Sequence, residues 1–335
     1  MLSGQMTEIR EQVPLVLSPE QPVTETAVHD LRVALRRSMT LLDALAPWFD
    51  PRWLSKQKTF FRGLLRSLGI VRDADVLAGL AESFFAGPEG SGLPGGQALL
   101  ERLRQSRDAA RLKLCHHLTG HDFTMKLARQ AARLNRTDVS LKMMPQAISA
   151  KGAVSLFRIG ELLPVMLYQA AARLTVYHTL VRESESGDPV ADAVLHQLRI
   201  AAKHFRYTVE HSQSLLGSAG RTLIREFRVF QDSLGNWHDA VVACALLTGL
   251  ETSGVSDAHA GSDASSDDAR ETGLADMEKE AVHSWFLHQE KQRDSLRLAF
   301  MELWRQMTPA WFHNHLSAAL DSLYAVKPDG SDTGR

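Results

Sequence analysis

Two stretches of the sequence carry histidine and basic residues at the same helical spacing. The first contains His29, Arg32 and Arg36. The second copy supplies, in the same order, His196, Arg199, Lys203 and Arg206. Because residues i, i+3 and i+7 lie on one face of an α-helix, each copy forms a stripe of positive charge. Arginine binds phosphate oxygens through two parallel hydrogen bonds and lysine adds a mobile point charge, so the stripes predict an anion site.

The next predicted helix of each half adds further cations at helical spacing. Lys58, Arg62 and Arg66 follow the first stripe, and Arg221, Arg225 and Arg228 follow the second. If the helices of each half pack with these faces together, the cations converge on one volume and favour an anionic ligand. Two other interpretations stay open. A charged stripe is commonly a solvated helix face, and single cations can pair with Asp73, Asp75, Glu226 or Asp232.

Other site chemistries find less support in the sequence. His117 and His121 have a chelating spacing, but Gly120 interrupts the helix and no glutamate completes a metalloprotease pattern, so we predict no metal and no cofactor. There is no phosphate-cradling glycine loop, no nucleophile elbow and no carboxylate pair for Mg²⁺. The tryptophans lie at apolar helical positions, so stacking aromatics among the cations are missing and nucleic acid is not favoured.

Composition is that of a globular protein with an uneven charge distribution. The 335 residues are 44% hydrophobic and 23% charged, with a net charge of −1. Basic residues concentrate in 29–72, 101–136 and 196–228, whereas acidic residues gather in 251–280. Cys115 and Cys244 give no disulfide framework. The sequence shows neither a signal-peptide pattern nor an apolar run long enough for a membrane span, so we expect a cytoplasmic protein.

Apolar periodicity predicts an all-α fold, because strand-like alternation persists nowhere. The predicted helices cover 24–46, 51–69, 72–86, 97–118, 122–135, 153–183 with a kink or break at Pro164, 189–217, 220–234, 238–250, 274–306 and a last stretch after Pro309. Residues 1–23 are expected to form a loose lead-in with a short helix at 6–13, and 87–96 a loop. Residues 251–273, rich in Ser, Asp, Gly and Ala, are expected to be disordered.

An internal repeat divides the chain into two halves of similar plan. The interval from His29 to His196 nearly equals that from Leu68-Gly69 to Leu234-Gly235. Arg107 and Arg111 match Arg293 and Arg297 at an interval that is longer by about the length of the acidic insert. The predicted organisation is a lead-in (1–23), a first helical-bundle repeat (24–136), a connector (137–152), a second repeat (153–324) that contains the acidic insert (251–273), and a tail (325–335).

These motifs resemble the CHAD family, the conserved-histidine α-helical domains. The resemblance runs from about residue 24 to 324 and is carried by 28–37, 68–73, 195–203, Arg206-Tyr207, Leu234-Gly235 and His238-Asp239. It implies a duplicated bundle with pseudo-twofold symmetry around a central basic groove or pore that binds inorganic polyphosphate. It also implies association of some stand-alone members with polyphosphate granules. Met39 stands where a basic residue is expected opposite Arg206, so we expect unequal binding by the two halves.

We therefore predict non-catalytic binding of inorganic polyphosphate or another linear polyanion, with no membrane partner. The alternatives are a polyphosphate- or phosphoanhydride-hydrolysing enzyme, and a helical adaptor or nucleic-acid binder. The predicted binding residues are His29, Arg32, Arg36, Arg37, Lys58, Arg62, Arg66, Arg72, Arg107, Arg111, His196, Arg199, Lys203, Arg206, Arg225, Arg228, Arg293 and Arg297.

Overall fold

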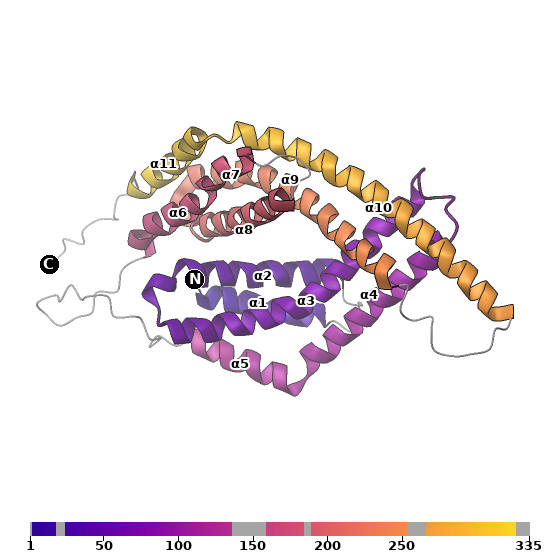
Figure 1. Cartoon of the computed structure of the whole chain (residues 1–335). Helices are drawn as coiled ribbons and strands as arrows, with labels where there is room; N and C mark the ends of the chain where they lie inside the picture. Colours follow the sequence, from indigo (N-terminus) through magenta and orange to yellow (C-terminus); the bar gives the residue numbers. More distant parts are fainter. Residues whose placement is uncertain (1, 18–23, 136–158, 184–188, 254–265, 326–335) are drawn as a thin grey trace, which may run out of the picture.

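The protein is all-α, as the apolar periodicity predicts (Figure 1). The computed structural model describes residues 2–17, 24–135, 159–183, 189–253 and 266–325, and within these ranges it contains no strand. The elements are α1 (Leu2–Val16), α2 (Glu25–Ala44), the 3-10 turn η1 (Ala46–Trp48), α3 (Pro51–Ala86), α4 (Gly96–Thr119), α5 (His121–Asn135), α6 (Ile159–Thr175), α7 (Tyr177–Glu183), α8 (Pro189–His211), α9 (Gln213–Ser253), α10 (Ser266–Gln306) and α11 (Pro309–Ala325).

Local sequence explains where the helices of the first half begin. The Thr24 hydroxyl accepts a hydrogen bond from the Ala27 amide (3.1 Å) and caps α2. Asp50 accepts from the Trp53 amide (2.8 Å) at the start of α3, where Pro51 occupies the first helical position. Both starts agree with the sequence prediction.

The predicted helix ends at the two Leu-Gly pairs are wrong. Gly69 lies inside α3, which runs for 36 residues, and Gly235 lies inside α9, which runs for 41. A glycine within a helix costs only about 1 kcal/mol, which the apolar contacts on both sides of it can outweigh. The backbone of α9 leaves helical geometry instead at Gly217, where φ is 57°.

Three further segments differ from the prediction. The lead-in forms the full helix α1, and its Met6, Ile9 and Val13 are buried. The helix α6 continues through Pro164, and the break falls at Val176. Residues 251–253 end α9 and 266–273 begin α10, so this part of the predicted disordered insert is helical. The remainder of the insert, the whole connector (137–152) and all but the first residue of the tail lie outside the described residues.

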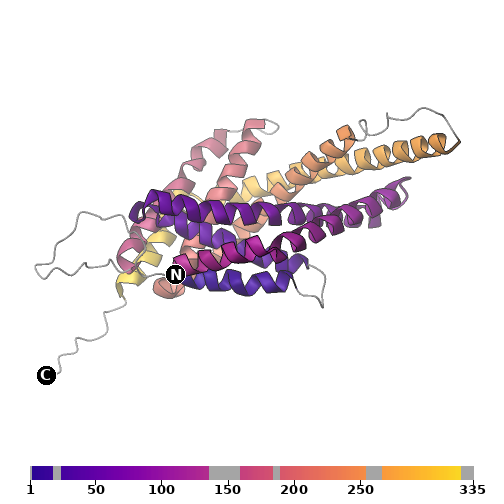
Figure 2. The ribbon, with the colours of Figure 1, turned by 90° about the horizontal axis from the view of Figure 1, so that it is seen from below.

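Buried apolar side chains form two helical bundles and an arm. The N-terminal bundle joins α1, α2, the first half of α3, the end of α4 and α5 around residues such as Leu35 and Phe61. The C-terminal bundle joins α6, α7, α8, the first half of α9, the end of α10 and α11 around Phe227 and Phe300. The remaining halves of α3, α4, α9 and α10 form the arm, which projects beyond both bundles in Figures 1 and 2.

The two bundles meet along α2 and α8, with α3 also contacting α9. A small apolar cluster that includes Trp48 and Met166 joins them near the end of α2. The stripe-bearing helices α2 and α8 therefore lie side by side at the seam of the molecule.

Among the described residues we find no helix with the length and apolar content that a bilayer crossing requires.

Candidate functional site: a basic pocket between the bundles

The seam holds a pocket of about 470 Å³, here called the basic pocket. Arg32 and Arg36 reach it from α2, and Arg199, Lys203 and Arg206 reach it from α8. Both stripes therefore face one shared volume, because α2 and α8 pack with their charged faces turned toward the same space.

The helices α3 and α9 close the sides of the basic pocket. Its described lining residues are His29, Arg32, Val33, Arg36, Arg72, Asp73, Val76, Arg199, Lys203, Arg206, Tyr207, Arg228, Gln231, Asp232, Gly235, Asn236, His238, Asp239 and Val242. Among them are seven arginine or lysine side chains and three aspartates. The pocket therefore concentrates positive charge in a chain whose net charge is −1.

Several of these cations have no carboxylate partner. Arg206 pairs with Glu210 at 3.2 Å, Arg72 pairs with Glu25, and Arg199 lies 3.9 Å from Asp239. Within the described part of the chain, Arg32, Arg36, Lys203 and Arg228 form no ion pair. Neighbouring like charges without counter-ions repel one another, so an anion placed among them would be stabilised.

Burial and neighbouring cations lower the pKa values of Lys203 and Arg32. Burial, followed by the charges of Arg199 and Arg36, lowers the pKa of Lys203 to about 6. Burial and the charge of Arg36 lower the pKa of Arg32 to about 10. At neutral pH the Lys203 amine is thus mostly uncharged in the unliganded protein, and an anion would favour its protonated form.

The histidines lie at the edge of this cluster. His29 lines the basic pocket, and burial and the charge of Arg72 lower its pKa. His196 is not among the described lining residues, but it contacts His238, which is: His196 Nδ1 and His238 Nε2 are 2.9 Å apart, so one nitrogen donates to the other. Burial and His238 lower the pKa of His196. Burial alone would raise the pKa of Asp239, but the hydrogen bond from His238 and the charge of Arg199 lower it.

Gly69 lies against the Arg32 guanidinium. A Cβ atom at this position would lie 3.3 Å from Arg32 Nη1, which is tighter than an ordinary contact. The Leu68-Gly69 pair therefore does not end a helix but leaves room for a side chain of the basic pocket.

Of the predicted binding residues, three clusters lie elsewhere. Lys58 pairs with Asp43, while Arg62 and Arg66 are exposed on α3, so the expected convergence of this row on the stripe residues is wrong. None of these three residues lines the basic pocket, whereas Arg72, farther along the same helix, does.

Arg37 and Arg225 line a neighbouring pocket of about 490 Å³, here called the lateral pocket. Arg37 Nη1 is 3.4 Å from Glu8 and its Nη2 is 3.3 Å from Glu210, so this arginine joins α1, α2 and α8. Arg228 lines both pockets and connects them.

The repeated arginines of α4 and α10 also lie outside the basic pocket. Arg111 binds the buried Asp75 carboxylate at 2.7 Å, and Arg297 binds Asp192 at 3.1 Å. Arg107 and Arg293 pair with the aspartates that follow them, Asp108 and Asp294. Arg111 and Arg297 thus join neighbouring helices, and Arg107 and Arg293 are neutralised by adjacent aspartates. The repetition of these four arginines is therefore explained by structural contacts.

Sequence reasoning did not include His238 or Tyr207 in the site. The repeat itself carried a signal for His238, because Leu234-Gly235 aligns with Leu68-Gly69 and so places His238 at the position of Arg72. Tyr207 follows Arg206, whose guanidinium carbon lies 4.9 Å from the ring centroid. Among the described residues no three His, Cys, Asp or Glu side chains are grouped so as to hold a metal ion.

The fold and the pocket define an all-α protein with a cationic pocket between two helical bundles. The chain belongs to the CHAD domain family, whose model matches residues 1–248.

Solved structures share this fold at low sequence identity. PptA from Streptomyces chartreusis superposes with a TM-score of 0.61 at 20% identity, covering 91% of this chain and 96% of that one. The CHAD domain from the plant Ricinus communis has a TM-score of 0.58 at 19% identity, covering 98% of this chain and 90% of that one. No curated protein matches the chain.

Proposed function

We propose that this protein binds inorganic polyphosphate in the basic pocket without cleaving it. The observation that carries the proposal is the convergence of cations from α2, α3, α8 and α9 on one volume, four of them without a carboxylate partner among the described residues. Membership of the CHAD family adds the expectation of polyphosphate binding that the sequence resemblance raised.

A linear polyanion suits this arrangement better than a single phosphate. Arg228 links the basic pocket to the lateral pocket, where Arg221 and Arg225 continue the row of cations. Each further phosphate of a chain would meet another guanidinium, so successive contacts would act as one multivalent interaction. Neutralising several phosphates also makes affinity depend strongly on salt.

The proposal includes the duplicated plan of the molecule. We infer that α2 and α3 correspond to α8 and α9, because Arg32 and Arg199, and Arg72 and His238, occupy matching repeat positions and face the same pocket. The pseudo-twofold axis would then run through the pocket. A cytoplasmic location, with association with polyphosphate granules, belongs to the same proposal.

Titration with long-chain polyphosphate at low and high salt tests the binding. We expect tight binding at low salt that weakens steeply as salt rises, and much weaker binding of monophosphate. Absence of binding at low salt, or affinity that ignores salt, would contradict the proposal. Release of phosphate from polyphosphate, with or without Mg²⁺ or Mn²⁺, would favour the enzymatic alternative, and equal competition by RNA or DNA would favour the nucleic-acid alternative.

A double charge reversal, Arg32→Glu with Arg199→Glu, locates the binding. It should abolish polyphosphate binding and leave helicity unchanged, because neither arginine is needed to start or cap its helix. The matched control is Arg62→Glu with Arg66→Glu, two exposed arginines outside the basic pocket. Equal loss in both double variants would show only a non-specific charge effect.

A further inference from the structure

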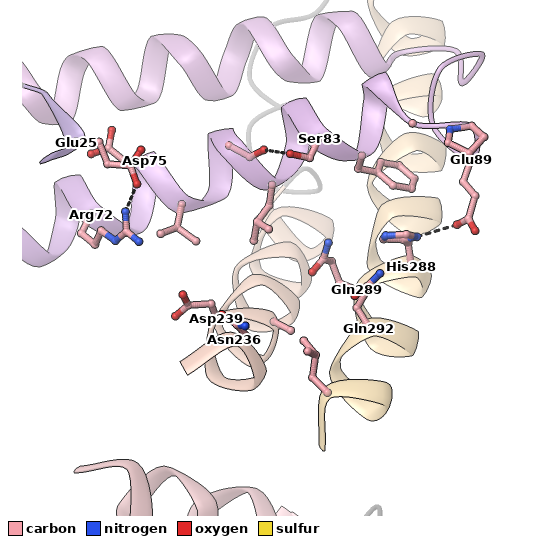
Figure 3. Close-up of a pocket in the computed structure, with 18 residues that line it drawn as sticks. Glu25, Arg72, Asp75, Ser83, Glu89, Asn236, Asp239, His288, Gln289 and Gln292 are labelled. Carbon is pink, nitrogen blue, oxygen red and sulfur yellow. Dashed lines mark hydrogen bonds and ion pairs between the residues drawn. The ribbon is translucent and has the colours of Figure 1, made fainter. Parts of the chain in front are cut away.

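A third pocket of about 750 Å³, here called the amide pocket, adjoins the basic pocket (Figure 3). It lies between α3, α9 and α10, and Arg72, Asn236 and Asp239 line both pockets. Figure 3 shows Arg72 and Asp239 at one end of the amide pocket and the His288–Glu89 pair at the other. A ligand held by the cations of the basic pocket could therefore extend past Arg72 into the amide pocket.

The charges that line the amide pocket are already balanced. Its four carboxylates each lie beside a cation or a histidine: Glu25 beside Arg72, Asp75 beside Arg111 at 2.7 Å, Glu89 beside His288 at 2.8 Å, and Asp239 near Arg199 at 3.9 Å. Among its lining residues, Arg72 is the sole arginine or lysine. Further phosphates would meet carboxylates there, so this pocket suits an uncharged group.

Carboxamides supply its polar recognition groups. Gln289 of α10 lines the amide pocket and is only 5% exposed. Gln292 stands on the same face of α10, and Asn236 faces it from α9. Each carboxamide offers a donor and an acceptor side by side, which matches the paired donor and acceptor edge of a nucleobase.

The opposite wall is apolar. Val76, Leu80 and Phe84 of α3 line it, and the Phe84 ring lies 5.0 Å from the His288 ring. An apolar wall opposite hydrogen-bonding amides favours a planar heterocycle, since ring faces need apolar or aromatic contact and ring edges need polar partners. The volume is within the range of about 300–1,000 Å³ that is usual for small-molecule sites.

We propose that the amide pocket binds the base and sugar of a nucleoside polyphosphate whose phosphates occupy the basic pocket. This inference rests on the proposed function, because the cations of the basic pocket would hold the phosphate chain. It adds a second ligand class to that site: a phosphate chain that ends in a nucleoside.

The test compares adenosine triphosphate with inorganic tripolyphosphate by calorimetric titration without magnesium. Both probes carry three phosphates, so the nucleoside is the main difference between them. We expect the nucleotide to bind at least about tenfold more tightly, a difference that corresponds to ~1.4 kcal/mol.

A glycine provides a variant that fills the amide pocket. Gly79 lines it, and a Cβ atom there would meet nothing within 4 Å, so Gly79→Leu should occupy the space without displacing the backbone. It should reduce nucleotide affinity to that of tripolyphosphate and leave tripolyphosphate affinity unchanged. Gly63→Leu is the matched control, because Gly63 lies in α3 with the same open surroundings but away from this pocket.

Equal affinity for the two probes in the unaltered protein would overturn the inference, as would a Gly79→Leu variant that weakens both probes equally. If polyphosphate and tripolyphosphate bind but the nucleotide gains nothing, only the inference fails. If the nucleotide binds while neither inorganic probe does, the polyphosphate proposal fails and the nucleoside pocket is supported.

Discussion

Lys203 shows at the residue scale how the basic pocket is suited to an anion. It faces Arg36 of α2, Arg199 and Arg206 of its own helix, and Asp239 of α9. In the unfolded chain its amine keeps its proton up to a pKa of 10.5, whereas in the folded pocket the pKa is about 6. Folding at pH 7 therefore removes a proton from Lys203. The contribution of Lys203 to the free energy of unfolding consequently rises with pH between these two pKa values.

Polyphosphate binding should become weaker as the pH rises above about 6. A bound phosphate favours the charged ammonium and raises the pKa of Lys203, so the complex takes up a proton in this range and affinity falls by up to about tenfold per pH unit. Titrations at pH 6.5, 7.5 and 8.5 at constant ionic strength measure the slope.

Lys203→Met should flatten that slope above pH 6.5. It should also raise the thermal midpoint of the unliganded protein at pH 7, because no proton must then be lost on folding. If the pH dependence of polyphosphate affinity is unchanged in Lys203→Met, the proton taken up on binding belongs to another group. His29 and His196 are the candidates, because their pKa values are lowered as well.

At the scale of the element, α3 carries two glycines in different surroundings. Gly69 faces the Arg32 guanidinium, whereas Gly63 has nothing within 4 Å of the place where its Cβ would lie. Both lie inside the same 36-residue helix, so alanine at either position should strengthen the helix by about 0.5–1 kcal/mol. The two alanine variants therefore differ mainly in the contact that position 69 makes with Arg32, and comparing them isolates the effect of this contact.

Gly69→Ala should weaken polyphosphate binding about two- to fivefold, which corresponds to ~0.5–1 kcal/mol, because the new methyl group displaces the guanidinium of Arg32 by a few tenths of an ångström. Gly63→Ala should leave the affinity unchanged. Paired thermal denaturation and polyphosphate titration of the two variants check both effects. Equal affinities in both would mean that Arg32 adjusts without loss.

At the scale of the whole molecule, Arg37 helps to hold the two bundles together. Its guanidinium pairs with Glu8 of α1 and Glu210 of α8, and its carbonyl oxygen lies 3.0 Å from His211 Nε2. Arg37 is one of the predicted binding residues, but these contacts place it at the interface between the bundles.

Arg37→Met should lower the free energy of unfolding by about 1 kcal/mol, because two half-buried carboxylates lose a shared cation. Polyphosphate affinity should change less than twofold, since Arg37 lines only the lateral pocket and its guanidinium is already paired with Glu8 and Glu210. Denaturant unfolding together with titration separates the two effects. Arg305→Met is the control: Arg305 is 71% exposed and pairs with Glu302 of its own helix, so its loss should matter little.

The sequence by itself determined the local features of this protein. Caps and prolines at Thr24 and Pro51 fixed helix starts, and the 3.6-residue period placed Arg32 with Arg36 and Arg199 with Lys203 on single faces. These features depend on residues within a few turns of one another. All-α class and CHAD membership follow from the same local patterns repeated along the chain.

Only the tertiary structure decided which cations share a volume. Arg111 has the residue type and the repeat position of a site residue, yet its partner Asp75 lies on another helix and binds it. The role of Gly69 also depends on Arg32, a residue of a different helix. The amide pocket joins residues of α3, α9 and α10. Helical periodicity fixes which side chains share a face, but packing between distant segments determines what that face meets.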